Sequence, residues 1–173
     1  MRKKIHIPVV LMGYMNPILQ FGFEAFCARA KEVGVDGLIL PDLPLFEFEN
    51  SYGKTIKDNG LDFIFLVTPE TPEERLRKLD SLSSGFLYAV SSSATTGTDK
   101  DFTKVAMYLE RLKSMQLKNP FLVGFGIKDK ASFDAVNVFA NGAIIGSAYI
   151  QALSKGKDVE TTTKTFLEGV LSN

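Results

Sequence analysis

This sequence has very little cysteine and histidine, and it has no excess of charge of either sign. The 173 residues include one cysteine and one histidine, and 20 basic residues balance 20 acidic ones. A formal net charge of zero leaves no basic surface of the kind that nucleic-acid binding needs. The lone cysteine, Cys27, excludes an intramolecular disulfide and fits a reducing, cytoplasmic compartment. Cys27 is expected to be a small buried side chain, not a nucleophile, and no catalytic role is expected for His6.

Long apolar runs are also missing. The runs present are much shorter than the ~20 residues that a helix needs to cross a bilayer, so we expect no membrane span. The opening, MRKKIHIPVVLMGY, has the basic start of a signal peptide. Pro8 and the Tyr14-Met15-Asn16-Pro17 turn interrupt its apolar stretch, and no small-residue cleavage site follows. This stretch is therefore expected to form a strand.

Short apolar runs instead alternate with amphipathic segments. The runs are Pro8–Met12, Gly37–Leu40, Asp62–Val67, Phe86–Val90, Phe121–Phe125 and Ala143–Ile145. Continuous apolar blocks of this kind are typical of parallel strands covered on both faces. Helices are predicted at Phe23–Val33, Arg75–Leu82, Phe102–Met115, Ala131–Phe139, Tyr149–Ser154 and Val159–Leu171. Thr71-Pro72-Glu73-Glu74 has the pattern of a capping box before the second of them. With no linker in the chain, residues 1–173 are expected to form a single domain.

Such alternation allows two architectures, an open doubly wound sheet and a (β/α)8 barrel. The positions of the glycines favour one of them. A dinucleotide-binding open sheet carries its glycine-rich turn after the first strand. Here the glycines follow the last two expected strands, at Gly124–Gly126 and at Gly146. In barrels, those loops and a short helix often form a phosphate site, so Gly146 and Ser147 are expected to present backbone N–H groups to an anion. Ordinary turn geometry is the alternative explanation.

A stretch rich in serine and threonine, YAVSSSATTGT, follows the fourth run at Tyr88–Thr98. Such a tract is either a surface linker or a lid over an active site. In combination with PVVLMGYMNPIL, VDGLILPDLP, FLVTPET, GFGI and GSA, which occur in order over nearly the whole chain, it resembles the alpha subunit of tryptophan synthase. Many members of that family carry arginine and glycine where this chain has Ser92 and Ala94.

The resemblance implies a fold, a reaction and a partner. The family forms a (β/α)8 barrel that cleaves indole-3-glycerol phosphate to indole and glyceraldehyde 3-phosphate. It passes the indole to a beta subunit, which holds the pyridoxal phosphate, so no cofactor is expected in this chain. The beta-subunit interface would lie near Asn16, Pro17, Asp42 and Pro44.

The resemblance also assigns substrate contacts. The phosphate would lie on Gly97, Gly126, Gly146 and Ser147, with Phe125 beside it and Thr96 as the lid threonine. The indole pocket would be lined by Tyr88, Met12, Tyr14, Ile39 and Leu66. Without the resemblance, Met12, Ile39 and Leu66 would be interpreted as barrel core.

The family's catalytic glutamate and aspartate find no match, because the resemblance starts at the third barrel strand and both would lie upstream of Met1. No catalytic residue is therefore assigned, and solvated or interface roles are expected for Asp42 and Glu47. The prediction is a partial barrel of about six β/α units, family strands 3 to 8, that is inactive alone and self-associates through its open edges. The alternatives are a non-catalytic phosphate-binding or interaction module and a different barrel enzyme, such as a sugar-phosphate isomerase or epimerase.

Overall fold

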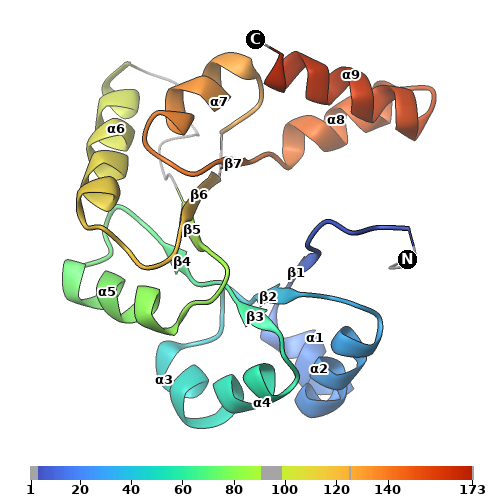
Figure 1. Ribbon diagram of the computed structural model, residues 1–173, viewed down its shortest axis with the longest axis vertical. Helices are drawn as coiled ribbons and strands as arrows, with labels where there is room; N and C mark the ends of the chain where they lie inside the picture. The colour runs from blue at the N-terminus through green and yellow to red at the C-terminus, as the bar shows by residue number, and fades with distance from the viewer. Residues whose placement is uncertain (1–3, 91–98, 125, 173) are drawn as a thin grey trace. The chain divides into compact units, whose positions relative to one another are not determined.

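The computed structural model describes residues 4–90, 99–124 and 126–172, in which parallel strands alternate with helices (Figure 1). The strands are β1 (Val10–Met12), β2 (Gly37–Ile39), β3 (Asp62–Phe63), β4 (Leu66–Val67), β5 (Leu87–Val90), β6 (Phe121–Gly124) and β7 (Ala143–Ile144). They form two sheets, with strand orders β1-β2-β3 and β4-β5-β6-β7. The chain divides into two compact units, Met1–Leu66 with Lys78–Leu87, and Val67–Arg77 with Tyr88–Asn173.

The first unit is built on the three-stranded sheet. Its helical segments are α1 (Met15–Phe21), α2 (Phe23–Glu32), α3 (Leu45–Glu47), the π-helical turn η1 (Phe48–Tyr52) and α4 (Gly53–Asp58). Parallel pairing matches Val10 with Gly37 and Met12 with Ile39. The core centres on three aromatic rings, Phe48, Phe63 and Phe65, whose centroids lie 4.7 to 4.9 Å apart. Edge-to-face and tilted contacts at this spacing add to the stability that their burial provides.

The second unit is built on the four-stranded sheet. Its helices are α6 (Asp99–Ser114), α7 (Lys130–Asn137), α8 (Ser147–Lys155) and α9 (Val159–Leu171), and α5 (Glu73–Leu82) is shared between the units. Strands β6 and β7 pair in parallel, with Val123 opposite Ala143 and Gly124 opposite Ile144. Helices α8 and α9 run side by side (Figure 1). Among the described residues, no helix is both long enough and apolar enough to span a bilayer.

One expected strand is interrupted. The apolar run Asp62–Val67 forms two short strands that belong to different sheets, β3 and β4. The buried hydroxyl of Ser83 donates to the carbonyl of Phe63 and accepts from the N–H of Phe65, at 3.1 and 3.4 Å. A side chain therefore takes hydrogen bonds that a neighbouring strand would otherwise make, and the prediction of one continuous strand is wrong at Ile64 and Phe65.

The helices also differ from expectation in four places. The Tyr14–Pro17 segment opens α1, because proline is tolerated in the first turn of a helix. The segment α3–η1–α4 was not predicted at all. Thr71, which was expected to begin a capping box, has a hydroxyl that accepts from the N–H of Thr68 at 2.9 Å and closes a turn before α5. Helix α8 begins two residues before the predicted start, at Ser147.

Candidate functional site

Gly124, the last residue of β6, has a packing role. A β-carbon built on it would lie 2.2 Å from the ring of Tyr88, far inside any real contact distance. Tyr88 is on the neighbouring strand β5 and is only 6% exposed, and burial raises the pKa of its phenol. The glycine is therefore required so that the tyrosine ring can lie across the end of β6. This is a close approach by a side chain, not by a phosphate.

Gly126 and Gly146 lie at corresponding positions beyond two paired strands. Gly126 comes two residues after Gly124, and Gly146 comes two residues after its register partner Ile144. The register thus carries both glycines to the same carboxyl edge of the sheet. Gly126 has φ +80°, a conformation that glycine adopts without strain. A β-carbon on Gly146 would meet nothing within 4 Å, so the approach to this backbone is unobstructed.

The start of α8 follows directly on Gly146. The first N–H groups of a helix have no partner inside it, and Gly146 supplies no side-chain cap. The two helices on either side are capped by their own aspartates, α7 by Asp129 and α9 by Asp158. Each of those carboxylates accepts a backbone N–H at 2.9 Å. At α8 the same donors and the positive end of the helix dipole face the exposed side of Ser147.

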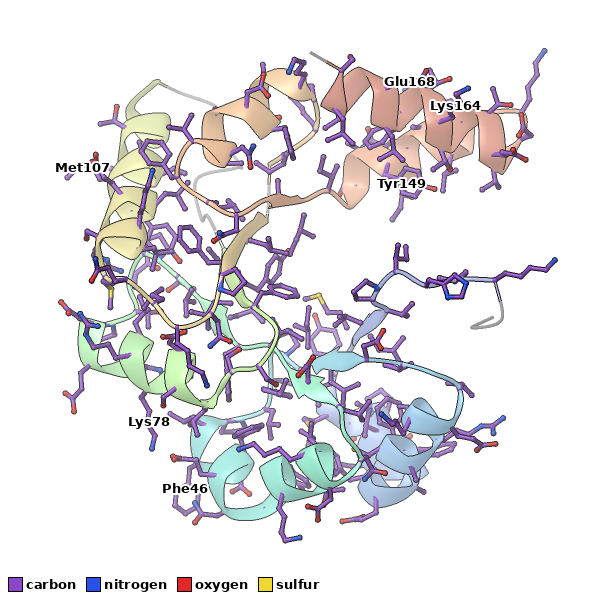
Figure 2. All side chains as sticks on the ribbon, in the orientation of Figure 1. Phe46, Lys78, Met107, Tyr149, Lys164 and Glu168 are labelled. Carbon is purple, nitrogen blue, oxygen red and sulfur yellow. The ribbon has the colours of Figure 1, made fainter. Side chains whose placement is uncertain are left out.

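Helix α9 holds α8 in place. The hydroxyl of Tyr149 lies 2.8 Å from that of Thr163, and its ring packs against Phe166 with centroids 5.4 Å apart. Figure 2 shows Tyr149 on α8, and Lys164 and Glu168 on α9. Lys164 and Glu168 form an exposed ion pair with a 4.0 Å separation, which contributes little to stability. The Tyr149 contacts therefore fix the direction of the α8 axis, and with it the direction of the first N–H groups of the helix.

The residues expected around an indole ring divide by unit and by burial. Met12 and Ile39 are register partners in the first sheet, so their side chains share one face. Ile39 is 6% exposed, as a core residue would be, whereas Met12 is 55% and Tyr14 is 66% exposed. Leu66 is half-buried. Exposure of this size does not fit the core interpretation of Met12. Thr96, Gly97 and Phe125, with the expected lid at Ser92–Thr98, lie outside the described residues.

Asp42 has a local structural role that the sequence did not reveal. Both of its carboxylate oxygens accept from the N–H of Met15, at 3.1 and 3.0 Å. Tyr14 gives α1 no side-chain cap, so the carboxylate caps the helix from a loop 27 residues away. The contact joins the two segments that carry Asn16, Pro17 and Pro44, which are all exposed.

Other reactive groups in the described part of the chain are not assembled into a site. Cys27 is fully buried, and burial, with a smaller effect from Glu24, raises its thiol pKa to about 11. No group of three or more acidic, histidine or cysteine side chains among the described residues could hold a metal ion. A cavity of about 530 Å3 lies at the other end of β6, between α6 and Asn141, and none of the predicted site residues lines it.

Taken together, these features define a parallel α/β protein of the β/α-barrel class. The family model for the tryptophan synthase alpha chain matches residues 1–171. The chain belongs to the tryptophan synthase alpha chain family. It is 48% identical over 160 residues to the alpha chain of Bacteroides thetaiotaomicron, covering 92% of this chain and 62% of that one. It is 50% identical over 153 residues to the alpha chain of Parabacteroides distasonis, covering 88% and 60%.

Solved structures agree with the sequence relatives. The tryptophan synthase A-subunit of Pyrococcus furiosus matches with a TM-score of 0.84 at 33% identity, over 99% of this chain and 69% of that one. The tryptophan synthase complex of the same organism matches with a TM-score of 0.82 at 31% identity, over the same shares. The predicted fold class, a partial barrel, is confirmed by these likenesses. The chain spans about three fifths of the length of the curated relatives described above.

Proposed function

We propose that this chain supplies the substrate-binding half of an indole-3-glycerol-phosphate lyase in tryptophan biosynthesis. The observation that carries the proposal is the pair Gly126 and Gly146, level with each other at one sheet edge, next to the uncapped start of α8. A helix start of this kind binds the phosphate of a ligand through backbone N–H groups. As a separate part of the proposal, the exposed Met12 and Tyr14 of the first unit offer apolar surface that suits a flat aromatic ring.

The phosphate step can be tested on individual amides. Titration with indole-3-glycerol phosphate, followed by NMR, should shift the N–H signals of Gly126, Ser147 and Ala148. The N–H signals of Ser132 and Thr161 are matched internal controls, because each of these N–H groups already donates a hydrogen bond to a carboxylate. If all five signals shift alike, or none shifts at millimolar ligand, the proposed phosphate site is wrong.

Binding without turnover is the second part of the proposal. Cleavage of the bond to indole needs a positioned acid near the ring and a base at the glycerol hydroxyl. Asp42 is the acid candidate at the carboxyl edge of the first sheet, but its carboxylate is engaged with Met15 N–H. Glu47 is only half-buried, and Ser51 donates a 3.4 Å hydrogen bond to it. Residues 1–173 alone should therefore release no indole above background, and robust release would assign acid–base work to residues such as Asp42.

The proposed partners are a beta subunit and a second copy of this chain. Asp42 holds the Asn16–Pro17 segment against the loop that carries Pro44, which supports a shared interface, and the matching Pyrococcus furiosus structure is a tryptophan synthase complex. Pyridoxal phosphate would belong to the beta subunit. Strand β1 is an edge strand of its sheet, and its Leu11 is 39% exposed. An exposed edge of this kind favours pairing between copies. A clean monomer at micromolar concentration in sedimentation would refute the pairing.

A non-catalytic phosphate-binding module is the second candidate, and the same open helix start supports it. The two candidates differ in the aromatic half of the ligand. A lyase-derived site should bind indole-3-glycerol phosphate more tightly than glycerol 3-phosphate, whereas a simple phosphate module should bind both equally. We place the chain in the cytoplasm, where the single buried Cys27 stays reduced.

A further inference from the structure

The turn after β4 is closed by its own residues. The N–H of Thr71 donates to the carbonyl of Thr68 at 3.0 Å, and the N–H of Thr68 donates to the Thr71 hydroxyl at 2.9 Å. Pro69 and Pro72 fix two of the φ angles in this turn. Three carbonyls of this segment, those of Val67, Pro69 and Thr71, accept hydrogen bonds from side chains of one helix.

That helix is α6. Tyr108 is 4% exposed, and its hydroxyl donates to the carbonyl of Val67 at 2.9 Å. One turn further along, Nη2 of Arg111 donates to the carbonyls of Pro69 and Thr71, at 3.1 and 3.2 Å. The Arg111 guanidinium also lies over the Tyr108 ring, 5.6 Å from its centroid. Burial raises the pKa of Tyr108, so its hydroxyl keeps its proton and stays a donor at physiological pH.

The far end of α6 is tied to the same segment from the other direction. Arg77, on α5, donates to the carbonyl of Met115 just beyond the end of α6, at 3.3 Å. Glu73 holds that arginine with a 2.8 Å hydrogen bond. The segment Val67–Arg77 and helix α6 are therefore joined at two places about one and a half helical turns apart.

We infer that Tyr108 and Arg111 are positioning residues that latch the Val67–Pro72 turn to α6. The turn leaves β4 at its carboxyl end, and loops at the carboxyl ends of barrel strands build the substrate sites of such proteins. Surface ion pairs and exposed arginines add little to stability, so an exposed Arg111 that binds two carbonyls is better explained by the turn geometry that it sets. Loss of the latch should loosen the turn and weaken substrate binding, a last step that rests on the proposed function.

Hydrogen exchange of single amides tests the latch without any ligand. The variants are Tyr108→Phe, Arg111→Met and Arg111→Lys, with Lys104→Met as a matched control on the same helix. Exchange at Thr68 and Thr71 should become about two- to tenfold faster in Tyr108→Phe and Arg111→Met, the range for one net hydrogen bond. Arg111→Lys should recover part of the protection, since the ammonium keeps its charge and donors. Ser132 and Thr161 amides in the capped helices should not change.

Two outcomes would overturn the latch. One is unchanged exchange at Thr68 and Thr71. The other is equal acceleration at these amides and at Ser132 and Thr161, which means general destabilisation. A second measurement, the affinity for indole-3-glycerol phosphate, separates the latch from the proposed function. If the unaltered chain does not bind, the proposed function fails while the exchange result still decides the latch. If it binds and Arg111→Met binds equally well with a loosened turn, the turn has no part in binding.

Discussion

The two sheets differ in how the helix that follows an edge strand is capped at its N-terminus. After β1, the first N–H of α1 is bound by the carboxylate of Asp42, which comes from a loop after the neighbouring strand. After β7, the start of α8 has no side-chain cap, and the residue before it is Gly146. The strand-to-helix step is the same in both places. What differs is whether the chain itself neutralises the donors of the helix start or leaves them for an anion.

The glycines that follow the strands differ in the space around them. Gly13 follows β1 and Gly146 follows β7, and a β-carbon on either would meet nothing within 4 Å. Gly124, at the end of β6, is packed under Tyr88. Glycine at a strand end is thus not one signal, because it can make room for a ring or leave a backbone accessible. Substitutions can separate these cases.

The largest effect is expected from Gly124→Ala. The new methyl would overlap the Tyr88 ring, and overpacking of this severity costs about 3 kcal/mol of unfolding free energy. Gly13→Ala, where the methyl enters open space, should change the unfolding free energy by less than about 0.5 kcal/mol. Urea denaturation of both variants measures the difference. In a Gly124→Ala/Tyr88→Leu double variant the costs should be less than additive, because the clash is gone. Equal stability of the two alanine variants would mean that Tyr88 moves aside freely.

Gly146→Asp should separate binding from stability. An aspartate at the start of α8 would occupy the anion position, so affinity for indole-3-glycerol phosphate should fall by at least about tenfold, or 1.4 kcal/mol. The helix itself should gain a few tenths of a kcal/mol from the same charge, by about the amount expected for a carboxylate near a helix N-terminus. Affinity is measured by titration calorimetry and stability by thermal melting. Gln151→Glu, which adds the same charge further along α8, is the control for both measurements. Unchanged affinity in Gly146→Asp would place the phosphate elsewhere.

Strand positions could be predicted from sequence because buried parallel strands are continuous apolar runs. Phe86–Val90 corresponds to β5 at Leu87–Val90, and Phe121–Phe125 corresponds to β6 as far as Gly124. The break between β3 and β4 could not be predicted. Residues Ile64 and Phe65 are as apolar as their neighbours, and the hydroxyl that interrupts the ladder comes from Ser83.

Site residues were predictable only in part, because contacts with distant residues decide their roles. The sequence indicated the glycines that follow β6 and β7, but it could not distinguish Gly124, which accommodates a ring, from Gly146, which is open. The cap that Asp42 gives to Met15 joins residues 27 apart and leaves no local pattern. Local periodicity predicts elements, whereas contacts between distant residues decide what the ends of those elements can bind.

Removal of the Asp42 carboxylate should produce a smaller effect. Asp42→Ala leaves the first N–H of α1 without its acceptor and should cost about 1 kcal/mol of unfolding free energy, the usual cost of a lost cap. If the segment carrying Asn16 and Pro17 contacts a beta subunit, affinity for that subunit should fall as well, measured by titration calorimetry. Glu47→Gln, on α3, is the matched control and should change neither quantity by more than a few tenths of a kcal/mol. A variant with full stability would show that α1 does not depend on the carboxylate.

The smallest expected effect is a pH dependence confined to α7 and α9. The hydroxyl and backbone N–H of Ser132 hold the pKa of Asp129 below its ordinary value of 3.8, and the backbone N–H and hydroxyl of Thr161 lower the pKa of Asp158. A depressed pKa in the folded state means that each cap stabilises its helix above pH 3.8 and is lost as the pH falls through the lowered value. The protection of the Ser132 and Thr161 amides, measured against the intrinsic exchange rate at each pH, should therefore fall on acidification below that pH, and Asp129→Asn or Asp158→Asn should remove this fall at its own helix. The first amides of α8, which no carboxylate caps among the residues that the structure describes, should show no such transition. An equal acid transition at Ser147 would mean that the start of α8 is also closed by an acidic group, and the contrast between the two kinds of helix start would fail.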